Sequence, residues 1–245
     1  KAYENAWKSK LAAKSYVGGF YMVFNIHAGH NPDGKIGCGA TGLIKESTEA
    51  RKVKNEVIRL LSENGNTVYD CTVDDGENQS DVLSKIVKKC NATNAELNVS
   101  IHFNAGANDN GGNGKTTGTE VFFYSKESRA FPYADRVCKS IASLGFKNRG
   151  VKVNTSLYVL RKTTASILIE CCFADDKDDV ALYDYKKMAK AIVEGILNKA
   201  IETKEEKTSN KTIYRVQVGA YSKKENAIAM QKKLKDAGFD AFITK

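Results

Sequence analysis

The 245-residue sequence contains only three histidines, two prolines and one tryptophan, and its six cysteines include no C-x-x-C pair. The missing pair argues against the common thiolate metal sites and against a thioredoxin-like redox motif. No apolar run approaches the roughly 20 residues that a membrane helix needs, so we expect no integral membrane association. The 9% aromatic content and the regular apolar patterns argue against a wholly disordered chain.

The composition is that of a folded, basic protein. With 42% hydrophobic residues the chain can bury a core without disulfides. Lys and Arg number 38 against 29 Asp and Glu, and the net charge of +9 favours an anionic partner such as nucleic acid, an anionic membrane or an acidic cell-wall polymer. Cys71, Cys90, Cys138 and Cys172 lie within apolar patterns, which predicts buried thiols and synthesis in the reducing cytoplasm.

The first 21 residues have no clear partner in the rest of the sequence. A short apolar run, Val17 to Ile26, continues into His27-Ala28-Gly29-His30 where a signal peptide would have a small-residue cleavage site. We therefore interpret residues 1–21 as a leader of uncertain origin and place the start of the folded domain at Met22.

Between residues 22 and 201, short β-rich runs alternate with amphipathic helical segments. This pattern predicts an α/β fold: a mixed, mostly parallel sheet of about six strands flanked by helices. The last helix is expected from Leu182 to Ile201. The expected strands are Met22–Ile26, Thr67–Cys71, Leu97–His102, Thr119–Tyr124, Leu157–Leu160 and Ser166–Cys171.

Two polar stretches interrupt these patterns. The Gly- and Asn-rich segment Asn104–Gly118 predicts a long flexible loop, and long loops in compact domains often carry function. Residues 202–211 have no residue able to anchor a core and predict a linker. The remaining segment, 212–245, predicts a short β-α-β fragment, with strands Ile213–Val218 and Asp240–Thr244 around a helix at Lys223–Ala237. It has too little apolar surface to be stable alone.

Two histidines and two glutamates stand out by position. His30 and His102 lie at or just past the ends of expected strands, where open α/β sheets build active sites. Glu46 opens the first long helix, and Glu170 ends an apolar strand. A carboxylate there costs several kcal/mol unless it is paired, for example with Arg161, or belongs to a site. Hydrolytic zinc sites commonly use two histidines and one glutamate, with a further carboxylate to move the proton.

Six motifs, in this order, resemble those of the zinc-dependent N-acetylmuramoyl-L-alanine amidases of the type-3 family. The resemblance covers roughly residues 22–200 and implies an α/β fold, a single Zn²⁺, and cleavage of the amide between the lactyl group of N-acetylmuramic acid and L-alanine in peptidoglycan. The motifs are Ile26-His-Ala-Gly-His30, Gly42-Leu-Ile-Lys-Glu46, Ser100-Ile-His-Phe-Asn-Ala105, Gly118-Thr-Glu-Val-Phe-Phe-Tyr124, Leu157-Tyr-Val-Leu-Arg161 and Ile167-Leu-Ile-Glu-Cys-Cys-Phe173.

The resemblance implies a role for each matching residue. His30, Glu46 and His102 become the zinc ligands, and Glu170 becomes the catalytic acid/base. His27 stands where family members often carry an acidic residue, so it is an alternative imidazole. Glu49 is an alternative to Glu46, but three residues along a helix it points about 300° further round, which predicts a solvent-exposed side chain.

The C-terminal segment resembles the first half of a SPOR domain, a peptidoglycan-binding module, through Val216-Gln-Val-Gly-Ala-Tyr221. Half a domain implies either a truncated chain or an oligomer in which two copies exchange strands. A basic β-α-β unit is also half of an RNA-recognition fold, but paired exposed aromatics on its strands are missing. We therefore expect peptidoglycan as the partner and no nucleic acid.

These observations predict an enzyme that degrades cell walls, either a phage endolysin or a bacterial autolysin. Such an enzyme is made in the cytoplasm and acts at the cell wall after phage lysis or export. Two alternatives remain: another zinc peptidase acting on the stem peptide, and a non-catalytic protein that binds the cell wall.

Overall fold

The computed structural model describes residues 21–203 and 216–244. The chain divides into two compact units, with the boundary between Ile201 and Glu202. Residues 1–20 of the expected leader and residues 204–211 of the expected linker lie outside the described ranges. Each unit is described by itself below.

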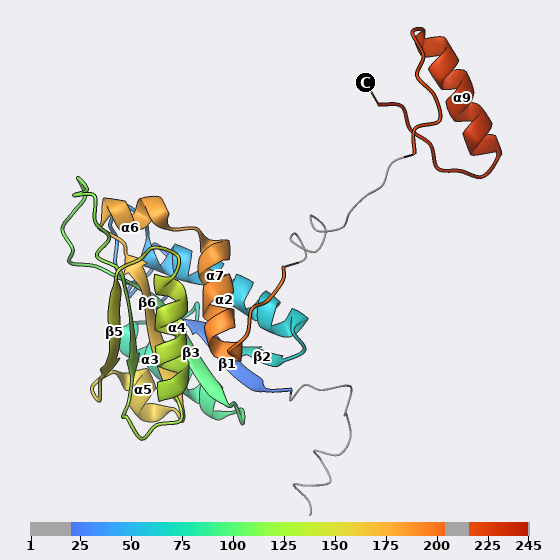
Figure 1. The fold of residues 1–245 in the computed structure, drawn as a ribbon. Helices are drawn as coiled ribbons and strands as arrows, with labels where there is room; N and C mark the ends of the chain where they lie inside the picture. Colours follow the sequence, from blue (N-terminus) through green and yellow to red (C-terminus); the bar gives the residue numbers. More distant parts are fainter. Residues whose placement is uncertain (1–20, 204–215, 245) are drawn as a thin grey trace, which may run out of the picture. The chain divides into compact units, whose positions relative to one another are not determined.

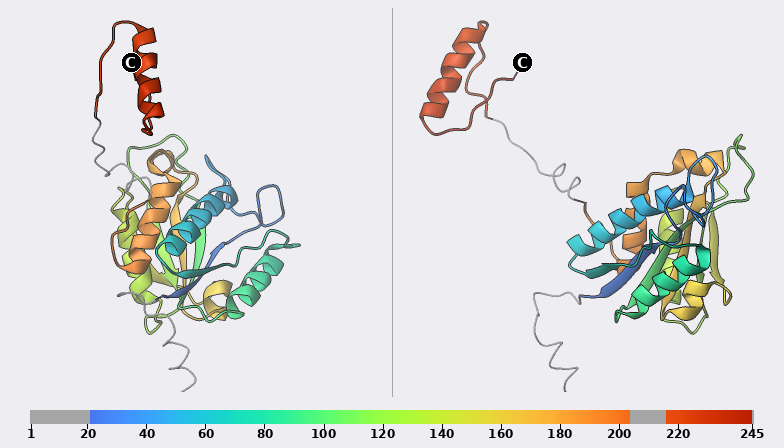
Figure 2. Two further views of the ribbon diagram at one scale, coloured as in Figure 1. Left: turned by 90° about the vertical axis from the view of Figure 1, so that its right-hand side faces the viewer. Right: turned by 180° about the vertical axis from the view of Figure 1, so that it is seen from behind.

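The first unit has a six-stranded sheet between two helical layers (Figures 1 and 2). The strand order is β2-β1-β3-β6-β4-β5; β4 runs antiparallel to β6, and every other neighbouring pair is parallel. The expected mixed, mostly parallel sheet is confirmed. The strands are β1 (Val23–Ala28), β2 (Thr67–Asp70), β3 (Leu97–Asn104), β4 (Thr119–Phe123), β5 (Asn148–Val153) and β6 (Ser166–Phe173).

The two faces of the sheet differ in their cover. One face packs against α2 (Glu46–Glu63), α4 (Phe131–Ala142) and α7 (Tyr185–Leu197) in a large apolar core. The other packs against α3 (Gln79–Asn91) and α5 (Tyr158–Lys162) in a smaller cluster.

The alternation of side chains along β3 and β6 sets the position of the polar residues. Ile101 and Ile169 face the large core. Since neighbouring side chains of a strand point to opposite faces, His102 and Glu170 face the side of the smaller cluster. Leu168 belongs to that cluster, whereas Glu170 lies two residues further toward the carboxyl end of β6.

The expected strand at 157–160 is wrong, because this segment forms α5. The Asn154 side chain accepts hydrogen bonds from the backbone N–H groups of Ser156 and Leu157, which turns the chain into that helix. A short apolar run does not by itself distinguish a strand from a buried helix. The sixth strand is instead β5, which was not predicted because its sequence is charged and contains no apolar run. Charged residues are typical of a strand at the edge of a sheet.

The region after β6 also differs from expectation. The helix expected at 182–201 is found as the shorter α7, and the sequence analysis did not predict the short helix α6 (Lys177–Leu182) before it. Each of the two helices begins after an aspartate N-cap, Asp176 for α6 and Asp184 for α7. The Gly- and Asn-rich loop at 104–118 is more fixed than its composition predicts. Asp175 accepts hydrogen bonds from the backbone of residues 106–108, and Asp178 accepts them from that of residues 113–115.

The second unit contains α9 (Lys224–Asp236), close to its expected position. The described residues on either side, 216–221 and 240–244, form no strand; residues 213–215 of the first expected strand lie outside the described ranges. Of the expected β-α-β fragment, the described residues therefore contain the helix but neither strand. Val216, Phe239 and Phe242 are exposed, which fits a segment too small to bury its apolar side chains.

Two expectations from composition can be compared with the fold. All six cysteines are free thiols, and only Cys38 is not buried. In the described ranges, no helix has both the length and the apolar character needed to cross a membrane.

Candidate active site

Three side chains predicted as ligands meet at the carboxyl edge of the sheet. His30 follows β1, Glu46 is the first residue of α2, and His102 lies near the end of β3. Glu46 Oε1 is 3.3 Å from His30 Nε2 and 2.9 Å from His102 Nδ1. One ligand atom from each residue lies within 4.8 Å of the others, which is a spacing that one metal ion can bridge.

The backbone holds the Glu46 carboxylate in place. Its Oε2 accepts a hydrogen bond from the N–H of Ala40 at 2.7 Å, and its Oε1 accepts one from Phe103 at 3.2 Å. The start of α2 also favours a negative charge there. Burial opposes ionisation, but contacts with His102 and His30 outweigh it and lower the pKa of Glu46. The side chain is therefore in the anionic form that binds a metal.

His102 is held as a neutral imidazole. Burial lowers its pKa, against the opposing effect of the Glu46 carboxylate. While Nδ1 faces Glu46, Nε2 lies 2.9 Å from the Ser100 hydroxyl, which orients the ring. Neutral imidazole is the protonation state that metal binding needs.

Two glycines permit this close packing. A Cβ at Gly29 would lie 1.8 Å from His102 Cε1, and one at Gly39 would lie 2.4 Å from Glu46 Oε2. Gly39 also has a φ of +80°, which disfavours other residues. The site therefore accepts no side chain at either position without displacing a predicted ligand.

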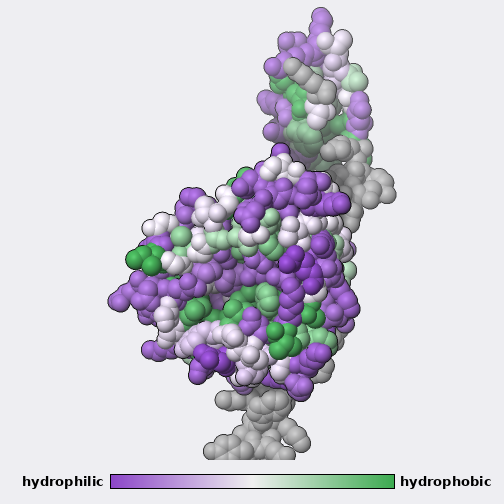
Figure 3. Space-filling model, turned by 90° about the vertical axis from the view of Figure 1, so that its left-hand side faces the viewer, coloured by the Kyte–Doolittle hydropathy of each residue, from purple (hydrophilic) through white to green (hydrophobic). Residues whose placement is uncertain are grey.

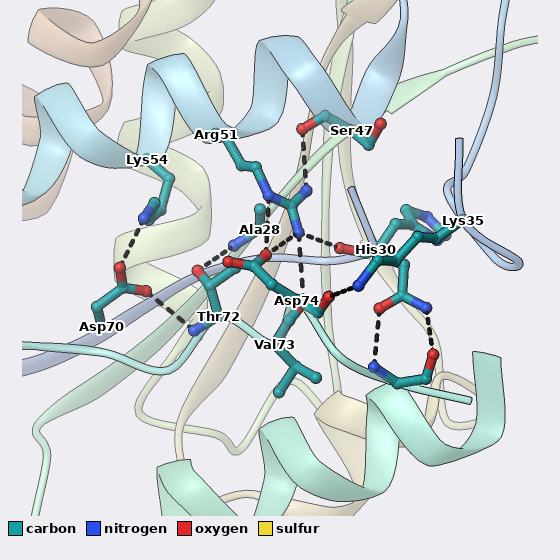
Figure 4. A network of polar contacts seen from close by, with 12 residues as sticks. Ala28, His30, Lys35, Ser47, Arg51, Lys54, Asp70, Thr72, Val73 and Asp74 are labelled. Carbon is teal, nitrogen blue, oxygen red and sulfur yellow. Dashed lines mark hydrogen bonds and ion pairs between the residues drawn. The ribbon is translucent and has the colours of Figure 1, made fainter. Parts of the chain in front are cut away.

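Arg51 ties His30 to the helix that carries Glu46 (Figure 4). Its Nη2 donates to the His30 carbonyl at 2.8 Å and to Asp74 Oδ1 at 2.5 Å, and its Nη1 donates to the Ser47 carbonyl at 3.0 Å. The His30 Nδ1 atom is buried and has no hydrogen-bond partner. Arg51 therefore fixes the His30 backbone, while the imidazole faces Glu46 with Nε2 and keeps Nδ1 without a hydrogen-bond partner.

Glu170 lies beside this cluster. In the parallel pairing of β3 and β6, it is in register with His102. Its Oε2 atom is buried without a hydrogen-bond partner. Burial, together with the charges of Glu46 and Glu120, raises the pKa of Glu170 to about 8. Among the described residues no ion pair joins Glu170 to Arg161, whose guanidinium instead lies over the Tyr158 ring, 5.8 Å from its centre.

The two alternative ligands lie outside the cluster. His27 is buried, with Nδ1 3.4 Å from the Ser100 hydroxyl, and burial followed by the charge of His102 lowers its pKa to about 3. Glu49 accepts a hydrogen bond from the Tyr183 hydroxyl at 3.1 Å and pairs with Lys52 at 2.8 Å. Its side chain is only 13% exposed, so the expectation of a solvent-exposed residue is wrong.

The sequence analysis missed two polar residues around the site, Glu120 beside Glu170 and Arg51 beside His30. Glu120 is buried and lies directly opposite Glu170 in the antiparallel pairing of β4 and β6. Burial opposes its ionisation, but hydrogen bonds from Lys152 and Arg149 outweigh this and lower its pKa. The signal was present, since Glu120 is a carboxylate in an apolar strand, as Glu170 is. Arg51 gave no such signal, because its helix carries many other charged residues.

The chain is similar in sequence and in fold to several known proteins. The chain is 36% identical over 186 residues to an uncharacterized protein of Clostridium perfringens strain 13, covering 74% of this chain and 53% of that protein. It is 32% identical over 181 residues to an endolysin of Bacillus phage SPP1, covering 69% and 61%. The solved catalytic domain of the CD27L endolysin, which targets Clostridia difficile, has 28% identity and a TM-score of 0.65, covering 74% of this chain and 100% of that domain.

Two family models match the sequence. The SPOR domain model matches residues 179–245, beginning before the predicted boundary at 212. The chain spans about half the length of the first curated relatives it matches, 53% of one and 47% of another. The model described as N-acetylmuramoyl-L-alanine amidase matches residues 25–202, which is most of the chain. The chain therefore belongs to the N-acetylmuramoyl-L-alanine amidase family.

Proposed function

We propose that residues 22–201 form a catalytic domain that hydrolyses the amide between N-acetylmuramic acid and L-alanine in bacterial peptidoglycan. The observation that carries this proposal is the meeting of two imidazoles and one carboxylate beside a buried, unpartnered carboxyl group, Glu170. Membership of the amidase family supports the choice of substrate.

The donor set fits Zn²⁺. His30, Glu46 and His102 offer two nitrogens and one oxygen, the set found in many zinc hydrolases. The orphaned His30 Nδ1 and the clearance provided by Gly29 and Gly39 favour a site built for an ion. When bound, Zn²⁺ supplies Lewis-acid activation of water and of the amide carbonyl.

Glu170 moves the proton in this proposal. Its carboxylate accepts a proton from the attacking water as the oxygen bonds to the lactyl carbonyl carbon. It then gives that proton to the nitrogen of L-alanine as the C–N bond breaks. The products are a free amine and a lactyl carboxylic acid, which releases its remaining proton to water. A pKa of about 8 suits both steps, because proton transfer in each direction is most efficient when the pKa is near the working pH.

The test is mass spectrometry of purified peptidoglycan digested by the protein. We expect stem peptides with a free N-terminal L-alanine and intact glycan strands. Cleavage within the stem peptide would show the alternative zinc peptidase. Binding to cell walls with no released peptide would show the non-catalytic alternative.

The second unit supports action at the cell wall. We propose that residues 212–245 are the SPOR-like part of a peptidoglycan-binding module, and that copies of the chain associate through it by exchanging strands. The net charge of +9 favours an anionic wall. The endolysin relative supports synthesis in the cytoplasm followed by release at phage lysis, and export is the route that an autolysin would take.

Arg51→Ala should weaken zinc affinity by about 10- to 100-fold, because the His30 backbone loses its tie to α2. Competition with a fluorescent zinc chelator measures the change. Arg59→Ala is the matched control: Arg59 is on the same helix but pairs only with Glu56 and Glu63 among the described residues. Equal zinc affinity in both variants and the wild type would show that Arg51 does not position His30.

A further inference from the structure

Polar side chains continue from Glu170 on β6 across β4 to the edge strand β5. Glu120, opposite Glu170, accepts hydrogen bonds from Asn104 Nδ2 at 3.0 Å, from Arg149 Nε at 2.9 Å and from the Lys152 ammonium. Arg149 and Lys152 belong to β5, the edge strand. Two strand spacings separate β5 from β6, which is about 10 Å.

Glu170, Glu120 and Arg149 lie at the same end of the strands, and Lys152 reaches them from further along β5 through its hydrogen bond to Glu120. β4 runs antiparallel to β6, so the start of β4 lies beside the carboxyl end of β6. β5 is parallel to β4, which places Arg149, near the start of β5, at this edge as well. Figure 3 shows the side of the first unit on which β5 lies in Figure 1, where hydrophilic residues surround smaller hydrophobic patches.

The two cations of the cluster are partly open to solvent. Both pair with Glu120, and their side chains are 29% exposed for Arg149 and 42% exposed for Lys152. Asp179 also lies within electrostatic range of Arg149, but among the described residues it forms no ion pair with it. Arg149 uses only Nε for Glu120, and in the described part of the chain neither of its Nη atoms has a hydrogen-bond partner. A purely structural role, in which Arg149 only holds the edge strand β5 against β4, would explain the Nε contact with Glu120. It would not explain why both Nη groups have no partner in the described ranges.

Arg149 is also held in a fixed orientation. Its guanidinium lies 4.9 Å from the centre of the Phe173 ring, while Glu120 fixes Nε. The two Nη groups therefore form a preorganised fork, which matches a carboxylate in bidentate geometry. Because this fork is partly exposed, it can reach a ligand in solvent.

We infer that Arg149, supported by Glu120 and Lys152, binds a free carboxylate of the stem peptide close to the scissile amide. This inference rests on the proposed amidase function. In peptidoglycan, L-alanine is followed by D-glutamate, which continues the chain through its side chain and leaves its α-carboxyl free. In an extended stem peptide, L-alanine and D-glutamate together span about 7 Å. The free α-carboxyl group adds to this length, which brings it toward the distance of about 10 Å between β6 and β5.

The experiment compares two disaccharide tetrapeptides that differ at this one group: D-glutamate with a free α-carboxylate, or D-isoglutamine with an amide. We measure kcat/KM for the wild type and for Arg149→Gln. The wild type should prefer the acidic substrate by about 10-fold or more, the size of a charge-assisted hydrogen bond. In Arg149→Gln the ratio of the two kcat/KM values should fall to about one.

Lys139→Gln is the control, since Lys139 is an exposed cation on α4 that pairs with Asp135. It should keep the wild-type preference. A purely structural tether would lower the melting temperature of Arg149→Gln and reduce both kcat/KM values equally, which would overturn the inference. Equal cleavage of both substrates by the wild type would overturn it too, with the amidase function intact. If the wild type released L-alanine from neither substrate nor from whole peptidoglycan, the proposed function itself would fail.

Discussion

Glu170→Gln should retain one bound zinc ion but lose about 10²- to 10⁴-fold in kcat, the usual contribution of a general acid/base. Glutamine keeps the shape of the side chain but cannot accept and return a proton. Glu170 is not among the three clustered ligands, so the metal should stay. Release of N-terminal alanine measures turnover, and elemental analysis measures zinc.

Glu127→Gln provides the matched control, because Glu127 is an exposed carboxylate in the segment between β4 and α4. It should have wild-type turnover and zinc content. Wild-type turnover in Glu170→Gln would show that another group moves the proton. Loss of zinc in that variant would instead place Glu170 among the ligands.

His102→Ala should lose both zinc and activity. The variant removes one of three clustered ligands and leaves the Glu46 carboxylate without one of its two histidine partners. A zinc ion contributes several kcal/mol of transition-state stabilisation, which corresponds to a loss of roughly 10³-fold or more. Zinc content and turnover measured on one preparation test both effects, and added zinc should restore a chelated wild-type sample but not the variant.

The control for His102→Ala is His27→Gln, which changes the other buried imidazole on the same face of the sheet. His27 lies outside the ligand cluster, and its Nδ1 atom is 3.4 Å from the Ser100 hydroxyl, which is a long contact. It should keep one zinc ion. If His27→Gln lost zinc while His102→Ala kept it, the ligand set would have to be revised to include His27.

The sequence predicted which residues lie close together because strand ends are simple to locate. His30, His102 and Glu170 each lie at the carboxyl end of an apolar run, and in a parallel sheet these ends share one edge. Glu46 was singled out by its place at the start of a helix and then by its motif. The fold shows what holds its carboxylate there: the start of α2 and hydrogen bonds from two backbone N–H groups.

The sequence failed where the local signal was weak or depended on distant residues. The strand β5 carries Arg149 and Lys152 in a charged sequence, which hides it from a search for apolar alternation. The loop at 104–118 gains its order from aspartates some 60 residues away, such as Asp178, and no local rule predicts those contacts. The role of Arg51 depends in the same way on a backbone carbonyl 21 residues earlier.

Anomalous diffraction at the zinc absorption edge, from crystals of the protein grown with zinc, would test the central claim most directly. We predict a single peak in the first unit, in contact with the side chains of His30, Glu46 and His102 and with Glu170 beside it. A peak held by other residues, such as the acidic group of Asp109, Asp176 and Asp178, with none at the histidines, would contradict the account.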